Sequence, residues 1–108
     1  MDINTKIAVV TGASKGLGAA LSSSLVAKGA IVYGLSRSKA DLNLQQAKLG
    51  EKFVPVTLDI TDQNAVYSWV SQTFTDQHSP DILINNAGMG HFGKIDELSL
   101  EQWHGMIN

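Results

Sequence analysis

The chain has 108 residues, enough for one compact hydrophobic core, so we expect a single domain spanning residues 1–108. Its formal net charge of −2, without a basic cluster, argues against a nucleic-acid or anionic-membrane partner. The absence of cysteine excludes disulfides and thiolate metal sites and is typical of a reducing, cytoplasmic setting. The first residues do not resemble a signal peptide, and the apolar runs are far shorter than the ~20 residues needed to cross a bilayer.

Strand and helix patterns alternate along the chain. Apolar segments rich in β-branched residues predict four strands, at residues 6–11, 30–36, 52–58 and 81–85. The segments between them predict helices at 19–28, from Ser38 or Asp41 to about 48, and from a cap at Thr61 or Asp62 to a break at 78–80. A loop over 89–98, with a short helix within it as the alternative, and a helix beginning at Ser99 follow. This order predicts a parallel sheet with right-handed crossovers and helices on both faces, a three-layer α/β fold.

Residues 11–18 read T-G-A-S-K-G-L-G and lie between the first strand and the first helix. Glycines allow a tight turn and a close backbone approach, and the N–H groups at a helix start attract phosphate. The spacing of Gly12, Gly16 and Gly18 differs from the general dinucleotide fingerprint, and Leu17 after Gly16 excludes a P-loop. The motif therefore indicates a phosphate site, with an ordinary glycine turn as the alternative.

Four segments in this order resemble the short-chain dehydrogenase/reductase family. They are T-G-x-x-x-G-x-G at 11–18, L-D-I-T-D at 58–62, N-N-A-G at 85–88 and S-L-E-Q-W at 99–103. The resemblance covers essentially the whole chain and matches the N-terminal, cofactor-binding half of that family. It implies a Rossmann-like fold with strand order 3-2-1-4, ending before a fifth strand. Pro55 agrees with this order, because proline favours an edge strand.

The resemblance implies a set of cofactor-binding residues: Gly12, Ser14, Lys15, Gly16, Leu17, Gly18, Ser36, Arg37, Asp59, Ile60, Asn86, Ala87 and Gly88. Among them, Asp59 is expected to accept a hydrogen bond from the adenine amine, with a simple turn cap as the alternative. Asn85 has a structural role or a cofactor contact as equal alternatives.

The cofactor expected at this site is NADP(H) rather than NAD(H). Residues 34–38 read G-L-S-R-S and lack the acid that would bind the ribose 2′-hydroxyl of NAD. Arg37 and Lys15 can instead pair with a 2′-phosphate. The alternative is that both are solvated surface cations.

We assign no catalytic residue to this chain. The family's Tyr-x-x-x-Lys pair is missing, since Tyr33 is followed by Arg37 and Tyr67 by Ser71. The family's catalytic Asn is expected seven residues after Trp103, beyond Asn108. Two functions stay open. One is an NADP(H)-dependent oxidoreductase, of which this is the dinucleotide-binding half and whose substrate is a small carbonyl compound or alcohol. The other is a catalytically inactive, truncated or vestigial nucleotide-binding module, in which the cofactor site could stay empty.

Two further expectations concern metals and assembly. Glu101 and His104 have helical i, i+3 spacing but lack a third ligand, so we expect no metal site. Without a fifth strand, residues 81–86 would form an apolar sheet edge, and the last helix would expose Trp103 and Met106. We therefore expect a homo-oligomer that pairs fourth strands or last helices.

Overall fold

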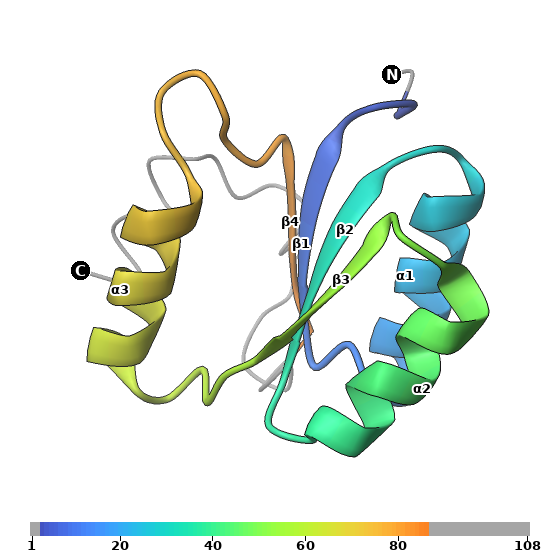
Figure 1. The fold of residues 1–108 in the computed structure, drawn as a ribbon, viewed down its shortest axis with the longest axis horizontal. Coiled ribbons are helices and arrows are strands. Elements are labelled where there is room, and N and C mark those ends of the chain that lie inside the picture. The colour runs from blue at the N-terminus through green and yellow to red at the C-terminus, as the bar shows by residue number, and fades with distance from the viewer. Residues whose placement is uncertain (1–2, 87–108) are drawn as a thin grey trace.

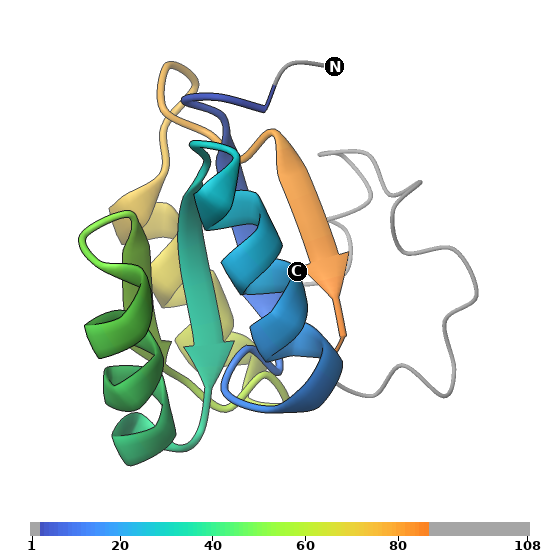
Figure 2. The same cartoon turned by 90° about the vertical axis from the view of Figure 1, so that its right-hand side faces the viewer.

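The computed structural model describes residues 3–86, which form four strands and three helices in strict alternation. In chain order they are β1 (Ile7–Thr11), α1 (Gly16–Ala27), β2 (Ile31–Ser36), α2 (Lys39–Leu49), β3 (Phe53–Thr57), α3 (Gln63–Thr73) and β4 (Ile82–Asn85). The four strands are parallel and lie in the order β3-β2-β1-β4. Helices α1 and α2 cover one face of the sheet and α3 covers the other (Figures 1 and 2). The expected fold class and strand order are confirmed.

The core consists of one apolar layer on each face of the sheet. On the α3 side, Val9, Leu35 and Leu83 pack with the helix residues Val66 and Val70. On the opposite side, the buried residues come from β1, β2, β3 and α2, with one alanine from each of the turns around α1: Ala8, Val10, Ala13, Ala30, Val32, Leu42 and Phe53. Successive β1 residues thus point to opposite faces, and the four from Ile7 to Val10 are apolar because both faces are covered.

The strands begin and end within one residue of their predicted bounds, but two helices differ from prediction. Helix α1 begins at Gly16 instead of residue 19, so the glycine motif supplies the first helical turn. Helix α3 ends at Thr73, before the predicted break at 78–80. Phe74 is extended and packs edge-on against Tyr33, and the chain then turns through a bridge between Thr75 and His78. Tertiary packing of Phe74 therefore ends the helix before the proline does.

Parallel strands bring their carboxyl ends to one edge of the sheet, and each helix begins at that edge. Strand β3 lies at one side of the sheet, with Pro55 opposite Gly34 of β2, as expected for a residue that cannot donate to a further strand. The helix starts, together with the ends of β1, β2 and β4, gather the polar residues of the sequence motifs. The predicted loop over 89–98 and the helix from Ser99 lie outside the described residues.

Candidate cofactor-binding site

A cavity of about 340 Å³ lies beyond the carboxyl ends of β1, β2 and β3. Its lining comes from the ends of these strands and the turns that follow them: Thr11, Gly12, Leu35, Ser36, Arg37, Leu58, Asp59, Ile60 and Thr61. Open α/β sheets bind their ligands in the crevice at this end of the strands. Five of the predicted cofactor-binding residues line the cavity, namely Gly12, Ser36, Arg37, Asp59 and Ile60.

The glycine loop leads from β1 into α1 and has structural reasons for glycine at three positions. Gly12 and Gly16 have φ values of 62° and 55°, in the left-handed region that favours glycine. Gly18 does not have a positive φ, and glycine is needed there because the position is buried. A Cβ atom there would collide with the carbonyl oxygen of Gly12 and lie 2.8 Å from Nδ2 of Asn86. The start of α1 therefore packs directly against the backbone of the loop.

The start of α1 has no side chain that caps it. Lys15 occupies the N-cap position in an extended conformation, and it makes no capping hydrogen bond. The first turn contains no acidic residue, while Leu17 is 53% exposed there and does not line the cavity. The N–H groups of a first helical turn attract anions, so this helix start can receive a phosphate.

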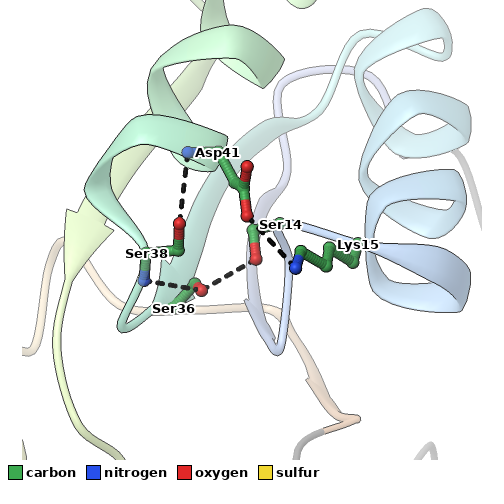
Figure 3. A network of polar contacts seen from close by, with 5 residues as sticks. All are labelled: Ser14, Lys15, Ser36, Ser38 and Asp41. Carbon is green, nitrogen blue, oxygen red and sulfur yellow. Dashed lines mark hydrogen bonds and ion pairs between the residues drawn. The ribbon is translucent and has the colours of Figure 1, made fainter.

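A chain of polar contacts ties the glycine loop to the turn between β2 and α2 (Figure 3). The Ser14 and Ser36 hydroxyl oxygens lie 2.8 Å apart, and the backbone N–H of Ser38 donates to Ser36 Oγ at 3.2 Å. Ser38 Oγ in turn accepts from the Asp41 N–H at 3.3 Å, and Lys15 Nζ lies 3.6 Å from Asp41 Oδ2. The structure thus brings Ser14, Lys15 and Ser36 together where α1 and α2 begin, while their contact with a cofactor stays a prediction.

Asp41 is a charged residue that the sequence interpretation missed at this place. Residues 34–38 contain no acid, but α2 delivers the Asp41 carboxylate to Lys15 across the gap between the two turns. Lys15 is 80% exposed, so this is a surface ion pair. Any anion that approaches Lys15 competes with Asp41. The spacing of Ser38 and Asp41 indicated a helix start, whereas their proximity to Lys15 depends on the fold.

Asp59 is held by its neighbour Thr61. Asp59 Oδ1 accepts hydrogen bonds from the Thr61 hydroxyl at 2.7 Å and from the Thr61 backbone N–H at 2.9 Å. The hydroxyl is the largest cause of a lowered pKa of Asp59, and the backbone N–H is the second. Burial acts in the opposite direction, and the positive charge of Arg37 adds a further lowering. Asp59 is therefore a carboxylate at neutral pH.

The two asparagines at the end of β4 both contact the β1 segment. Asn85 is buried, and its Oδ1 accepts from the Thr11 hydroxyl at 3.0 Å, which ties β4 to β1. Asn86 Nδ2 donates to the Gly12 carbonyl at 3.3 Å. Asn86 Oδ1 is buried and accepts no hydrogen bond from residues 3–86. Asn86 therefore lies against the glycine loop with one acceptor to spare, while Ala87 and Gly88 lie outside the described residues.

Four lining residues were absent from the predicted set: Thr11, Leu35, Leu58 and Thr61. Leu35 and Leu58 directly precede Ser36 and Asp59 in the sequence, so the motif positions indicated their neighbourhood. Thr61 had been interpreted only as a candidate helix cap, a role that Asp62 fills instead. Residues 3–86 contain no group of three side chains that could hold a metal ion, and Glu101 and His104 lie outside them.

Comparison with known proteins identifies the family. The short chain dehydrogenase family model matches residues 6–108. The 3-oxoacyl-[acyl-carrier-protein] reductase FabG of Haemophilus influenzae is 35% identical over 98 residues, which cover 91% of this chain and 40% of that protein. FabG of Vibrio harveyi is 32% identical over 108 residues, covering 100% of this chain and 44% of the relative. An uncharacterized oxidoreductase of Staphylococcus epidermidis is 31% identical over 106 residues, or 98% and 46% of the two chains.

This chain belongs to the short-chain dehydrogenase family, and it matches the N-terminal half of that fold. It spans less than half the length of the curated relatives described above. Membership implies a nicotinamide dinucleotide as cofactor. Among the described residues, no helix has the length and apolarity that a membrane crossing requires.

Proposed function

We propose that this chain is the dinucleotide-binding half of an NADP(H)-dependent oxidoreductase that acts on an alcohol or carbonyl group. One observation carries the choice of cofactor. Arg37 lines the cavity at the end of β2, next to Ser36, and no acid occupies positions 34–38. A guanidinium at this place favours a 2′-phosphate, whereas a carboxylate would favour the free 2′-hydroxyl of NAD.

The residues of the site fit a dinucleotide. The loop from Gly12 to Gly18 and the uncapped start of α1 would hold the pyrophosphate, because they offer backbone N–H groups without obstructing side chains. The cavity between Arg37 and Asp59 would hold the adenosine, and the unused Asn86 Oδ1 would face the ribose nearer the nicotinamide. When bound, the cofactor supplies or accepts a hydride, while these residues bind and orient it.

The cofactor preference can be tested with two nucleotides that differ only in one phosphate. We expect calorimetry to give adenosine 2′,5′-bisphosphate an affinity at least about fivefold higher than that of 5′-AMP. Arg37→Ala should reduce the difference, leaving only the contribution of Lys15, whereas Lys48→Ala, at an exposed cation in the last turn of α2, should preserve it in full. Equal affinities of the unmodified chain for the two nucleotides would contradict an NADP(H) site.

A second function, binding without catalysis, is favoured by one observation. The 108 residues contain no Tyr-x-x-x-Lys sequence, so no proton donor of that kind is available from them. We expect a polypeptide of these residues to show no oxidation of NADPH above background. The 3-oxoacyl-[acyl-carrier-protein] named for the FabG relatives is the first substrate to test. Turnover that disappears in Gly16→Trp would show that the 108 residues are active.

We further propose that the chain self-associates through β4 in a cytoplasmic setting, to which its cysteine-free composition is suited. Among residues 3–86, β4 pairs with β1 and has no strand on its other side, and it carries Ile82, Leu83 and Ile84. An apolar edge of this kind favours pairing with another chain.

We expect sedimentation velocity to give a dimer at tens of micromolar and Ile84→Lys to weaken it, with circular dichroism as the check on folding. A monomer of the unmodified chain would contradict this. Trp103 and Met106, the other predicted contact, lie outside the described residues.

A further inference from the structure

Asp41 lies three residues after Ser38, which is the spacing of a capping box at the start of a helix. In a capping box, the side chain of the first residue accepts from the N–H of the fourth, and the side chain of the fourth accepts from the N–H of the first. Only one of these hydrogen bonds is present at the start of α2. Ser38 Oγ accepts from the Asp41 N–H at 3.3 Å, but the Ser38 N–H donates to Ser36 Oγ at 3.2 Å. The box is therefore half closed.

The Asp41 carboxylate, which would close the box, lies beside Lys15 instead. Its Oδ2 is 3.6 Å from Lys15 Nζ, and it accepts no hydrogen bond from residues 3–86 (Figure 3). The Lys15 side chain is 80% exposed and the Asp41 side chain 31%, so solvent and ligands reach this pair. Ion pairs between exposed side chains contribute little to stability, because water and salt screen them. The carboxylate can therefore leave Lys15 with little loss of stability.

A 2′-phosphate bound between Arg37 and Lys15 would displace this carboxylate. A phosphate monoester carries up to about two negative charges, so it attracts a lysine more strongly than one carboxylate does and repels the carboxylate. The nearest backbone donor of the box is the Ser38 N–H, which a side chain at the position of Asp41 can reach by rotation about its own torsions. The dipole of α2 also favours a negative charge in the first helical turn.

We propose that Asp41 is a specificity-determining residue with two positions. It pairs with Lys15 in the structure, and it closes the capping box on the Ser38 N–H when a 2′-phosphate takes Lys15. Binding of the phosphate and capping of α2 are thereby coupled, so a nucleotide without the 2′-phosphate gains nothing from α2. This inference rests on the proposed function, because it takes Lys15 and Arg37 to hold the 2′-phosphate of the cofactor.

Two substitutions of Asp41 separate its two positions. Asp41→Asn removes the charge that pairs with Lys15 but keeps an oxygen that can accept from the Ser38 N–H, whereas Asp41→Ala removes both. We expect calorimetry on the 108-residue chain to give Asp41→Asn an affinity for adenosine 2′,5′-bisphosphate about threefold or more above that of Asp41→Ala, as for one hydrogen bond formed on binding. The two variants should bind 5′-AMP equally. Glu51→Gln and Glu51→Ala, the matched changes at an exposed acid before β3, should bind the bisphosphate equally.

The Ser38 amide reports on the capping box directly. In nitrogen-15 NMR spectra, the bisphosphate should move the Ser38 amide proton downfield in the unmodified chain, where it gains a carboxylate acceptor, and clearly less in Asp41→Ala. Equal affinities of the two Asp41 variants for the bisphosphate would overturn this inference alone, as would equal movement of the Ser38 amide proton in Asp41→Ala and the unmodified chain. Equal affinities of the unmodified chain for the bisphosphate and 5′-AMP would overturn the proposed NADP(H) site as well.

Discussion

Helices α1, α2 and α3 begin at the same edge of the sheet, but only α2 and α3 have a side chain that caps their first turn. Ser38 caps α2 by accepting from the Asp41 N–H, and Asp62 caps α3 by accepting from the Ala65 N–H at 3.1 Å. Helix α1 has Lys15 at its N-cap position without a capping hydrogen bond, and the lysine places positive charge at the positive end of the helix dipole. Helices α2 and α3 are thus capped by residues of their own sequences, whereas a bound anion would supply the cap that α1 lacks.

The start of α1, which has no side-chain cap, is held by close packing against the glycine loop and by local hydrogen bonds. Gly18 is buried against the Gly12 carbonyl, and the buried Ser22 hydroxyl donates to the Gly18 carbonyl at 2.8 Å. Further along, the Ala30 N–H donates to the Leu25 carbonyl at the end of the helix. Helix α1 is therefore held through the same glycine that keeps the phosphate side of the loop clear of side chains.

Gly18→Ala should give the largest effect on this comparison. Helix propensity alone would favour alanine by about 1 kcal/mol, but the new Cβ would collide with the Gly12 carbonyl and displace the loop. We expect a net loss of about 3 kcal/mol in the free energy of unfolding, measured with urea, and loss of NADP⁺ binding. Gly50→Ala is the control, because a Cβ there would meet no atom within 4 Å. Gly50 has a φ of 85° and a ψ of −160°, which glycine alone adopts readily, so a backbone strain of about 1–3 kcal/mol is expected without loss of NADP⁺ binding. Retention of NADP⁺ binding in Gly18→Ala would contradict the packing argument.

Substitutions of Lys15, the N-cap residue of α1, should change the free energy of unfolding by about 1 kcal/mol, depending on whether the new residue can cap the helix. Lys15→Ser and Lys15→Ala both remove the charge, but only serine can cap a residue in the extended conformation found here. We expect Lys15→Ser to be about 1 kcal/mol more stable than Lys15→Ala in the absence of ligand. Both should lose affinity for adenosine 2′,5′-bisphosphate. If the two variants unfold at the same urea concentration, a capping side chain does not stabilise α1, and the proposal that its first turn lacks a cap is wrong.

The sequence could predict the elements whose residues determine them locally, and it was less accurate where packing decides the structure. Strands were located within one residue because apolar β-branched runs that are covered on both faces leave a clear pattern. The start of α1 was placed three residues late because Gly16 and Gly18 have low helix propensity, and packing against Gly12 decides their conformation.

The candidate site was predictable where its residues belong to one motif and unpredictable where they meet across the fold. Arg37 and Asp59 could be predicted because they lie one and two residues after the ends of β2 and β3. The contact of Lys15 with Asp41 joins the starts of α1 and α2, and because the two residues are 26 positions apart, no local sequence pattern predicts it. Thr61 is different, because its position two residues after Asp59 allows a local hydrogen-bonded turn that could have been inferred.

Asp41→Asn should produce a smaller, ligand-specific change. Removing the carboxylate frees Lys15 and removes a negative charge from the approach of a 2′-phosphate. Exposed ion pairs contribute about 0.2–1 kcal/mol, so the affinity for adenosine 2′,5′-bisphosphate should rise by about two- to fivefold. The affinity for 5′-AMP should stay the same, and Glu51→Gln, at an exposed acid before β3, should change neither. A rise for both nucleotides would point to a general charge effect rather than to the Lys15 pair.

The smallest expected effect concerns the titration of Asp59. The Thr61 hydroxyl, followed by the Thr61 N–H, lowers the pKa of this carboxyl in the folded state. A lowered folded-state pKa means that the associated stability is present above the pKa of the unfolded chain and is lost as the pH falls through the folded-state pKa, which lies below the ordinary value of 3.8. Thr61→Val removes the larger of the two causes, so the Asp59 pKa should rise toward its ordinary value and the loss should begin at a higher pH. Carbon-13 NMR titration of the Asp59 carboxyl measures this directly, with Thr57→Val as the matched control. Identical titration curves in the unmodified chain and in Thr61→Val would show that the hydroxyl does not hold the carboxylate.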